Sequence, residues 1–501
     1  MAKSSKEHFP VWNKVGLFFL GALGALGFAP HYLWPATVVS IGAAYYLLKD
    51  KGFRYSFWWG AGYAAANFYW CFLYALDGES WHLYFAGTLG WMLVVGPIFA
   101  TPFAMTSATK AAGWRRTLYF ALACAFTLWL REWIYIAPWN PLANITMPNL
   151  RLSNSMSLVG ALGLTFVLAG CIASVPEYIQ SKSKWQFLFF VPLLLLWLSY
   201  DKHEGIESGK TVRLVNPAFS RSGDIIVYHD EGAYPGPGYD DFQPENKDLN
   251  KLMDLSAAEL DFPPDLIVWP ETAYPRDADM TTMFPALGTA LALGAVYREN
   301  GKSYNSLLYA GKDGRIVDMY HKVHLVPFGE YDPFLGLGPS SGIFSRGKGP
   351  KIIDDFAPSI CYDIAYSDTL IPKGQNGRPK YILNLTSDAW FGNTGGLYQH
   401  LDMIRRQAIE TGLPVVSSNY NGISAIVSNQ GVVLKSFPYG RAGFIDSVIP
   451  PHKITPYRKI GLNGIMLALA VLSGLILIIF RKKKLNYLAN ESARTRPDKS
   501  L

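Results

Sequence analysis

Eight apolar runs constrain this chain more than any other feature of its sequence. Seven lie within the first 200 residues, and the eighth, Gly461 to Phe480, stops at the basic cluster Arg481 to Lys484. The first seven have approximate limits of 14–30, 33–48, 56–76, 84–107, 117–137, 157–176 and 186–200. About 20 helical residues cross the roughly 30 Å hydrocarbon core of a bilayer, so the second and seventh runs are short. We expect a polytopic α-helical membrane domain of about eight spans.

Basic residues gather in alternate connectors between these runs. They lie between runs two and three (Lys49, Lys51, Arg54), four and five (Lys110, Arg115, Arg116), and six and seven (Lys182, Lys184). The other connectors hold no Lys and a single Arg, Arg151. Because cytoplasmic loops carry an excess of Lys and Arg, we expect the basic connectors and both termini in the cytoplasm. The long segment between runs seven and eight is then expected outside the cytoplasm.

The net positive charge follows from the same pattern. Lys and Arg outnumber Asp and Glu by 45 to 38, but the excess lies beside the apolar runs. It therefore reads as a topology signal and not as a nucleic-acid patch. The first run, with Lys3, Lys6 and Lys14 ahead of its apolar core, also resembles a signal peptide. Since further spans follow directly, we expect an uncleaved anchor.

The segment from about residue 208 to 455 has an α/β pattern. Nearly continuous apolar runs, typical of strands covered on both faces, begin at Thr211, Asp265, Leu291, Tyr381 and Pro414. Helix-like stretches cover 248–260 and 399–411, the pair 424–428 and 431–434 suggests a hairpin, and 228–243 and 336–349 read as long loops. We expect an α/β sandwich with a mixed sheet.

These patterns divide the chain into four parts. We expect a membrane domain with about seven transmembrane helices at 1–207 and an α/β domain at 208–455. The last transmembrane helix with its basic stop follows at 456–484, and a disordered cytoplasmic tail at 485–501. Arg131 and Glu132 lie near the end of the fifth run, and we expect an ion pair there beneath the α/β domain.

Three positions in the α/β segment share one pattern, an apolar strand that ends at a polar residue in a turn. They are Glu271 in Trp269-Pro270-Glu271, Lys322 in Tyr320-His321-Lys322, and Cys361 in Ser359-Ile360-Cys361. Such residues can converge at one edge of a sheet, where α/β folds bind their ligands. A carboxylate can take the proton of a thiol, and an ammonium can stabilise an oxyanion. Together the three residues suffice for acyl transfer.

Cys361 is the only one of the four cysteines outside the apolar runs. Cys71, Cys124 and Cys171 lie within them, where a free cysteine usually behaves as a small hydrophobe. A lone thiol in a polar segment is either an inert core residue or a reactive one. Taken alone, Cys361 fits the inert interpretation better, but the matching positions of Glu271 and Lys322 reverse that preference.

We expect no metal and no cofactor. His321 and His324 are possible ligands, but no HExxH motif or carboxylate–histidine cluster accompanies them. The chain also lacks a GxxxxGK[ST] phosphate loop. A thioester intermediate carries the driving force for amide formation, so acyl transfer needs no nucleotide.

The segment 208–455 resembles the nitrilase, or carbon–nitrogen hydrolase, superfamily, which is marked by a Glu–Lys–Cys triad in this chain order. More narrowly, nearly the whole chain resembles the family of bacterial apolipoprotein N-acyltransferases. The motifs that carry the resemblance are Trp269–Glu271, His324–Tyr331, Cys361–Asp363 and Ser387–Gly392, followed by Gln399-His400 and 419–425. The arrangement of eight spans with the catalytic domain before the last one also matches.

The resemblance implies a nitrilase-like catalytic domain and a two-step reaction on the outer face of the bacterial inner membrane. Glu271 would be the general base, Lys322 would hold the oxyanion, and Cys361 would attack the ester of a phospholipid, typically phosphatidylethanolamine. The thioester acyl-enzyme would then pass its acyl chain to the α-amine of S-diacylglyceryl-cysteine at an apolipoprotein N-terminus. This order is ping-pong.

The resemblance also implies supporting residues. Glu330 matches a second family glutamate near the site, and the backbone N–H of Tyr362 is a second oxyanion donor. Asp363 stands where these acyltransferases usually have Glu, which puts its supporting role in question. The family's tryptophan in the loop after the first strand of the domain has no counterpart in Val215 to Gln243, so handling of the acyl donor or acceptor is expected to differ.

Two other functions remain open on the residues alone. A membrane-tethered amidase or nitrilase-type hydrolase would use the same triad, with water resolving the acyl-enzyme. A non-catalytic membrane scaffold would not need Glu271, Lys322 and Cys361 together. The lipid-facing helices favour a lipid substrate, and nothing in the sequence indicates an obligate oligomer, so we expect a monomer.

Overall fold

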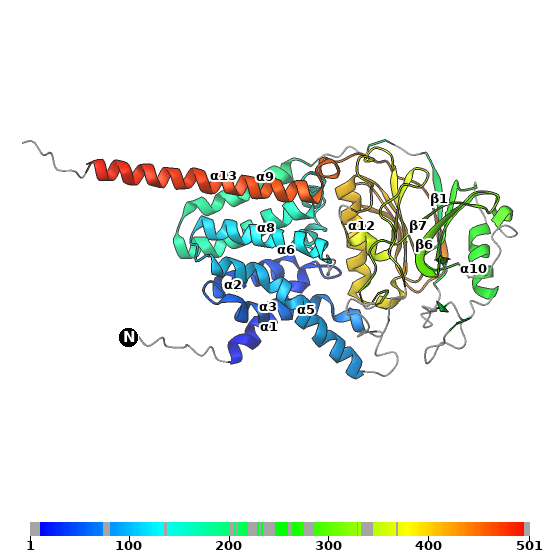
Figure 1. Cartoon of the computed structure of the whole chain (residues 1–501), viewed down its shortest axis with the longest axis horizontal. Helices are drawn as coiled ribbons and strands as arrows, with labels where there is room; N and C mark the ends of the chain where they lie inside the picture. The colour runs from blue at the N-terminus through cyan, green and yellow to red at the C-terminus, as the bar shows by residue number, and fades with distance from the viewer. Residues whose placement is uncertain are drawn as a thin grey trace, which may run out of the picture.

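The structure is a computed structural model with a helical part and a sheet-containing part side by side (Figure 1). It describes residues 11–73, 81–134, 138–200, 205–206, 209–218, 228–229, 232–233, 246–258, 263–274, 284–327, 329–331, 344–366 and 369–494. Most residues of the predicted loops at 228–243 and 336–349 lie outside these ranges. Only the two-residue strands β2 (Tyr228–His229) and β3 (Gly232–Ala233) are described in the first of them.

Each predicted apolar run coincides with a helix. The helical part consists of α1 (Val11–Gly24), α2 (Trp34–Leu47), α3 (Gly52–Asn67), α5 (Trp81–Ala108), α6 (Trp114–Trp133), α7 (Leu150–Ser153), α8 (Met156–Ser181), α9 (Phe190–Leu198) and α13 (Pro456–Arg494). By length and composition, three helical segments among the described residues can cross a membrane: Tyr84–Ala108, Met156–Ser181 and Pro456–Ile479. The stretches Asn13–Gly27 and Lys184–Leu198 are apolar but shorter. The total of eight spans therefore stays a prediction.

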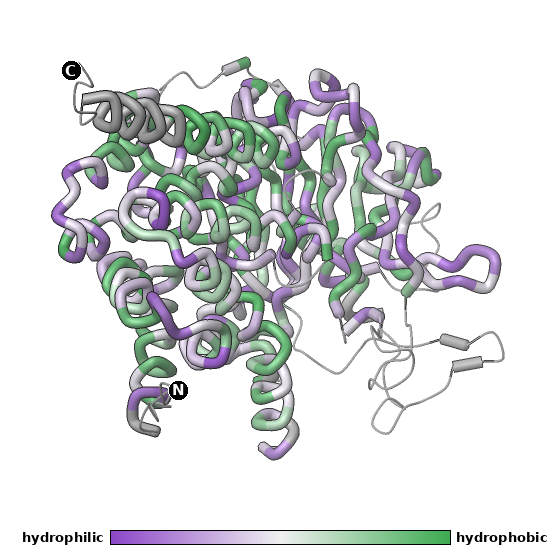
Figure 2. Tube along the Cα trace, turned by 60° about the vertical axis from the view of Figure 1, so that its left-hand side comes forward, coloured by the Kyte–Doolittle hydropathy of each residue, from purple (hydrophilic) through white to green (hydrophobic). Residues whose placement is uncertain are grey.

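The last helix runs further than the sequence suggested. α13 continues past the basic cluster to Arg494, whereas a disordered tail was expected from residue 485 (Figure 1). The added residues include Leu485, Leu488 and Ala489, which have high helix propensity and let the helix continue beyond its apolar stretch. Apolar side chains such as Leu467 and Leu472 are exposed along α13, as expected of a helix in contact with lipid. Figure 2 shows the described part of this helix as mostly hydrophobic.

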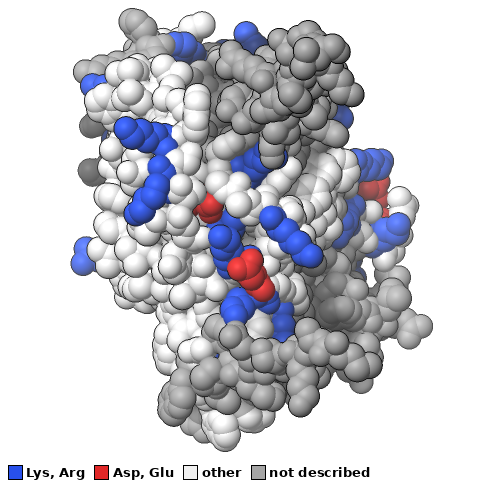
Figure 3. All heavy atoms as spheres, turned by 90° about the vertical axis from the view of Figure 1, so that its left-hand side faces the viewer, with Lys and Arg blue, Asp and Glu red and all other residues white. Residues whose placement is uncertain are grey.

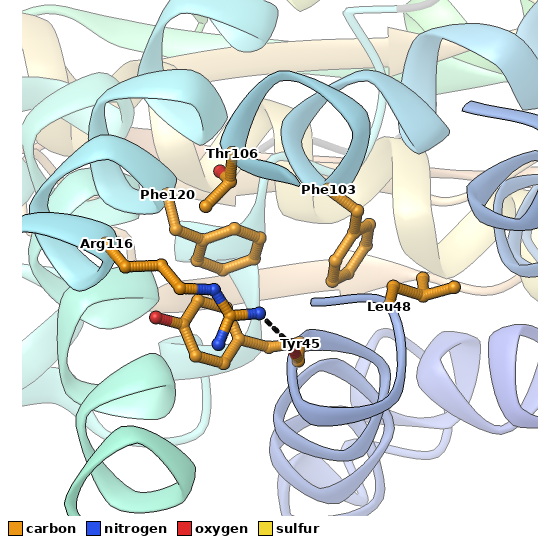
Figure 4. A pocket seen from close by; sticks show the side chains of 6 residues that line it. All are labelled: Tyr45, Leu48, Phe103, Thr106, Arg116 and Phe120. Atoms are coloured by element: carbon orange, nitrogen blue, oxygen red, sulfur yellow. Dashed lines mark hydrogen bonds between the residues drawn. The ribbon is translucent and has the colours of Figure 1, made fainter. Parts of the chain in front are cut away.

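An ion pair is buried where α2, α6 and α8 meet. Arg116 lies 3.1 Å from Glu177, and both side chains are almost fully buried. The guanidinium of Arg116 sits over the ring of Tyr45 and donates to the Tyr45 carbonyl oxygen, and Phe103 and Phe120 line the same pocket (Figure 4). Removal of one partner would leave a buried charge uncompensated, at a cost of about 3–5 kcal/mol. This cluster fixes the mutual positions of the three helices.

The two ends of the helical part differ in charge. The basic connectors meet at one end: Lys49 donates to Gln180 at 2.9 Å, and Gly113 donates its backbone N–H to Glu177. This end lies farthest from the sheets and displays more Lys and Arg than Asp and Glu (Figure 3). Two of the connectors without lysine face the sheets instead, since Tyr32 hydrogen-bonds Asp402 and Trp139 hydrogen-bonds Gln399.

Two stacked mixed sheets form the other part. The first contains β1 (Thr211–Asn216), β4 (Leu266–Val268), β5 (Ala290–Glu299), β6 (Lys302–Ala310), β7 (Ile316–His321) and β13 (Gly443–Val448) in the order β13-β1-β4-β5-β6-β7. The second contains β8 (Phe356–Ile360), β9 (Tyr381–Thr386), β10 (Val415–Asn419), β11 (Ser424–Val427) and β12 (Val433–Phe437) in the order β12-β11-β10-β9-β8. The predicted α/β sandwich, its five named strands and the β11–β12 hairpin are confirmed.

One helix covers the outer face of each sheet. α10 (Asn246–Ala257) packs Leu249 and Leu252 against the six-stranded sheet. α12 (Gly395–Thr411) packs Met403 and Ile404 on the five-stranded sheet, in one apolar cluster with Phe68, Trp70 and Trp139 of the helical part. The layers are thus helix, sheet, sheet, helix, with α12 between the sandwich and the membrane helices (Figure 1).

The predicted pair Arg131 and Glu132 lies at this junction. Both residues are buried at the end of α6 nearest the sheets, and the guanidinium of Arg131 donates to the Trp139 carbonyl oxygen and packs over the ring of Phe99. An ion pair between Arg131 and Glu132 themselves remains a prediction.

Candidate active site

Glu271, Lys322 and Cys361 each lie within three residues of the end of a strand, as the sequence pattern predicted. Glu271 follows β4 in a tight turn, Lys322 follows β7, and Cys361 follows β8 as the first residue of a 3₁₀ turn, Cys361–Ala365. β4 and β7 belong to one sheet and β8 to the other. The three residues therefore lie where the two sheets meet, at the ends of these strands.

Glu271 and Lys322 are in direct contact. The Nζ atom of Lys322 lies 3.2 Å from Oε1 of Glu271 and 2.8 Å from Oε1 of Glu330. All three side chains are almost completely buried. The sequence predicted the approach of these residues, and the structure brings them together as one ammonium between two carboxylates.

Asn305 completes this cluster, and no sequence pattern predicted its role. Its Nδ2 donates to Glu271 at 2.7 Å and to Glu330 at 2.9 Å, while its backbone oxygen accepts from Lys322 N–H. Glu330 also accepts from the backbone N–H of Val326 at 2.8 Å. Asn305 lies inside strand β6, where a single buried Asn in a strand is indistinguishable by pattern from any inward-facing polar residue.

The electrostatics of the cluster follow from burial of three charges together. Burial is the main cause that raises the pKa of Glu271, and the negative charge of Glu330 adds to it, while Lys322 opposes it. Burial alone would lower the pKa of Lys322, but Glu271 and Glu330 more than offset this and raise it well above its ordinary value. Lys322 thus stays an ammonium, and Glu271 is a stronger base than an exposed glutamate.

Cys361 is held in an unusual backbone conformation. Its φ is 47°, in the left-handed region that residues other than glycine rarely adopt. Strain of this kind persists where the surroundings over-determine it, and it is frequent at active sites. The residue is partly buried. Burial is the main cause that raises the pKa of its thiol well above the ordinary value, with Glu271 adding to this effect and Lys322 opposing it.

Asp363 is fully buried and anchors the turn that carries Cys361. Its two carboxylate oxygens accept from the backbone N–H groups of His324 (2.8 Å) and Ile360 (3.1 Å) and from the Tyr320 hydroxyl (2.9 Å). His324 Nδ1 adds a contact of 3.0 Å. With its shorter side chain, Asp363 reaches both the Cys361 turn and the segment that follows Lys322.

The remaining predicted positions are less completely described. The Tyr362 ring packs edge-on against Tyr366, and its backbone role as an oxyanion donor stays a prediction. His324 lies against Asp363 and Tyr366, and His321 contacts Ser306 at 2.7 Å. Within the described ranges, no group of three or more His, Cys, Asp or Glu is arranged to hold a metal ion. The loop without tryptophan, 215–243, falls almost entirely outside the described residues.

A second buried polar cluster lies on another side of Cys361. Asp388 accepts from Asn419 Nδ2 and pairs with His400 Nδ1, each at 2.7 Å. Asp388 and His400 belong to the motifs at Ser387–Gly392 and Gln399-His400, but no sequence pattern predicts that they contact each other. The strand register places Asp388 beside Asn419, because β9 and β10 are parallel neighbours that pair Thr386 with Asn419.

The Glu271 turn depends on a glycine in the neighbouring strand. A Cβ atom added to Gly294 would lie 2.5 Å from the Glu271 Cα and 2.4 Å from the Pro270 oxygen. A glycine within a strand often marks such a close backbone approach. We expect Gly294→Ala to displace Glu271 and lower acyl-transfer kcat by about 100-fold, since a misplacement of about 1 Å can cost that much. A matched control is Gly377→Ala, because no atom lies within 4 Å of its added Cβ. Equal kcat for both variants would contradict this account of Gly294.

Comparison with known proteins matches both parts of the chain. The family model "Apolipoprotein N-acyltransferase N-terminal domain" matches residues 20–174, and "Carbon-nitrogen hydrolase" matches residues 243–459. An apolipoprotein N-acyltransferase of Rhodopseudomonas palustris is 28% identical, over 94% of this chain and 96% of its own. One from Brucella melitensis is 29% identical, over 88% and 90%.

Among solved structures, XC1258 of Xanthomonas campestris, a CN-hydrolase superfamily protein, is 19% identical with a TM-score of 0.34, over 48% of this chain and 90% of that one. The two family models follow one another in the order of the two structural parts, and the similarity to the two curated relatives runs through both. Residues 243–459 thus match the carbon–nitrogen hydrolase model, and the chain resembles the bacterial apolipoprotein N-acyltransferases along nearly its whole length.

Proposed function

We propose that this enzyme transfers an acyl chain from a phospholipid to the N-terminal amine of S-diacylglyceryl-cysteine in apolipoproteins, through a thioester on Cys361. The observation that carries the proposal is the buried Glu271–Lys322–Glu330 cluster beside Cys361, in a domain joined to apolar helices. Phosphatidylethanolamine is the acyl donor we expect. The product is a triacylated lipoprotein.

In the first step the thiol of Cys361 attacks the ester carbonyl of the phospholipid. Because its pKa is raised, the thiol is protonated in the resting enzyme, and Glu271 takes the proton as the C–S bond forms. The ammonium of Lys322 stabilises the oxyanion of the tetrahedral intermediate, with the backbone N–H of Tyr362 as a second donor. The C–O bond then breaks, Glu271 returns the proton to the leaving oxygen, and a lysophospholipid departs.

In the second step the neutral amine of the acceptor attacks the thioester carbonyl. Glu271 removes a proton from the attacking nitrogen, the C–S bond breaks, and the Cys361 thiol recovers its proton. The amide product leaves with the acyl chain, and no oxidant, reductant or nucleotide enters the balance. Because the two substrates react in separate steps through a covalent intermediate, the kinetics are expected to be ping-pong.

Glu330 and Asp363 act through the three reacting groups. Glu330 shares Lys322 with Glu271 and keeps the ammonium charged, as its direct contact of 2.8 Å supports. Asp363 ties the Cys361 turn to the backbone after Lys322. In this proposal both are positioning residues.

For the membrane arrangement we propose about eight spans, with residues 1–207 and 456–484 in the membrane, the domain 208–455 on the periplasmic side of the inner membrane, and both termini in the cytoplasm. The charge difference between the two ends of the helical part supports this orientation, because the basic end lies away from the sheets (Figure 3). The sheets would then meet the acyl donor at the outer surface. We propose a monomer.

The experiment that tests the function follows a labelled acyl chain. Purified enzyme is given phosphatidylethanolamine labelled in its acyl chain, with and without a synthetic diacylated lipopeptide. We expect label in a triacylated lipopeptide, in amide linkage. Label recovered only as free fatty acid would support the hydrolase alternative, in which water resolves the thioester, and would overturn the transfer function.

The charge of Glu330 should set the acid side of the pH–rate profile. The step that needs ionised Glu271 is lost as pH falls through the pKa of Glu271, which lies above its ordinary value partly because of Glu330. In Glu330→Gln that contribution is gone, so we expect the acid limb of the acylation rate to move to lower pH. Single-turnover acylation measured across pH checks this. Glu299→Gln, at an exposed position on β5, is the matched control, and an identical shift in both variants would contradict the assignment.

A further inference from the structure

His400 is buried, and its polar and aromatic contacts go beyond what packing alone requires. It lies on α12 and is about 1% exposed, and its Nδ1 is 2.7 Å from Asp388. Its ring stacks on Trp139 at a centroid distance of 5.6 Å and meets Phe391 edge-on. Asp388 is itself held by Asn419 and lies in the turn after β9. Asp388 therefore holds Nδ1 of His400, and Asn419 holds Asp388.

The other nitrogen of His400 faces the nucleophile turn without a completed hydrogen bond. Nε2 is buried, and no partner within hydrogen-bonding geometry occurs among the described atoms. α12, which carries His400, nonetheless lies against the 3₁₀ turn Cys361–Ala365, and the Cys361 backbone favours the protonated imidazole. A buried donor left unpaired costs about 1–3 kcal/mol, so native proteins rarely keep one without a role. The backbone of the turn that carries Cys361 is the acceptor available to this N–H donor.

The charge state of His400 fits a donor at Nε2. Burial by itself lowers the pKa of the imidazole, but Asp388 and the Cys361 backbone outweigh it and the net pKa is raised. The charged groups that act on it are Asp388 beside Nδ1 and, to a smaller extent, Glu271. Below its raised pKa the ring carries a proton on both nitrogens. Above it, the remaining proton stays on Nδ1 toward Asp388, and Nε2 becomes an acceptor.

We propose that His400 is a positioning residue for the nucleophile, which donates Nε2–H to the backbone carbonyl of Cys361 when the site is acylated, while Asp388 fixes its Nδ1. The inference rests on the proposed role of Cys361. Asp363 holds the same turn through the Ile360 N–H, so the left-handed backbone of Cys361 is clamped from two sides. Loss of the His400 clamp lets the thiol leave its line of attack without removing any reacting group.

Two substitutions separate this role from simple packing. In His400→Gln the amide nitrogen occupies the place of Nε2 and can still donate toward Cys361. In His400→Asn the amide nitrogen occupies the place of Nδ1, so the contact to Asp388 persists and the donor toward Cys361 is lost. We expect His400→Asn to slow single-turnover acylation about 100-fold with KM for the donor unchanged, and His400→Gln to stay within roughly tenfold of wild type. A packing role predicts equal losses, or the reverse order.

The pH dependence supplies a second readout that does not need a stable Asn variant. In wild type the Nε2 donor is lost as pH rises through the raised pKa of His400, so the acylation rate should fall on that side. The amide of His400→Gln does not titrate, so the fall attributable to His400 should be absent. The same alkaline profile in wild type and His400→Gln would overturn the inference. Covalent label that forms on Cys361→Ala would instead overturn the proposed function, which keeps the two failures distinct.

Discussion

Cys361→Ala is expected to lose acyl transfer by a factor of about 10⁴ or more, with no acyl adduct on the protein. The reason is that both half-reactions pass through the bond between the acyl group and Cys361 Sγ, and no other described thiol has a carboxylate and an ammonium beside it. Loss of one sulfur from a partly buried position leaves the packing of the two sheets intact. Folding should therefore be preserved, and the measurement is transfer of labelled acyl chains from phosphatidylethanolamine to a diacylated lipopeptide.

Cys124→Ala provides the matched control for this loss. It removes a thiol from α6 inside the helical part, where the side chain is partly buried and packs in the apolar core. We expect its transfer rate to equal that of wild type. A Cys361→Ala enzyme that still formed a triacylated product at more than trace rates would rule out the covalent mechanism.

Lys322→Met should produce the second-largest effect, on both rate and stability. The ammonium is the only cation within hydrogen-bonding reach of Glu271 and Glu330 among the described residues, so its removal leaves two carboxylates buried together. We expect kcat to fall by about 10²–10³ as the oxyanion loses its charge partner. Breaking the buried cluster should cost about 3–5 kcal/mol in the free energy of unfolding.

The stability loss in Lys322→Met has a definite pH dependence. Without Lys322 the pKa of Glu271, already raised by burial, rises further because its one opposing charge is gone. The protonated carboxyl tolerates burial, so the variant is closest to wild type at low pH and loses stability as pH rises through the raised pKa. Chemical denaturation at several pH values, with exposed Lys302→Met as control, checks this trend.

A double variant separates the two roles of Lys322. Adding Glu330→Gln to Lys322→Met removes one of the two buried charges, so part of the lost stability should return while kcat stays low. Recovery of kcat together with stability would mean that Lys322 acts only through folding. That result would contradict its assignment to the oxyanion.

The sequence predicted that the three candidate catalytic residues would lie together, because each one comes shortly after an apolar strand. This pattern makes Glu271, Lys322 and Cys361 recognisable in the sequence, since strand ends in an α/β sandwich meet at its edges. Asn305 is not visible, because it lies within β6 and reaches Glu271 only through the order of strands in the sheet. Strand order depends on long-range pairing, such as that of β13 with β1, which no local pattern encodes.

The partners of Asp363 and His400 could not be predicted for a related reason. Tyr320 and His324 lie about forty residues before Asp363 in the chain and meet it across the two sheets. Asp388 and His400 are only twelve residues apart, but they face each other through a 3₁₀ turn and the first turns of α12. Local propensity predicts such turns poorly, because side-chain contacts of this kind decide their shape.

In the helical part, hydropathy located the helices better than it located their ends. The runs near 14–30 and 33–48 predicted longer helices than α1 and α2. α1 ends at Gly24, before the 3₁₀ turn Ala25–Gly27, and α2 ends at Leu47, where the chain turns at the basic end. α13, by contrast, is longer than its apolar run, because it continues through a polar segment of good helix formers. Apolar length predicts where a helix meets lipid, whereas caps and neighbouring contacts decide where it stops.

The central claim, an acyl-enzyme on Cys361, is tested most directly by mass spectrometry of the intact protein after incubation with phosphatidylethanolamine alone. The account predicts a mass increase of one acyl chain, located on the peptide that contains Cys361, removed by neutral hydroxylamine and discharged by a diacylated lipopeptide. An adduct on another residue, or acyl transfer that proceeds with no adduct under single-turnover conditions, would contradict it.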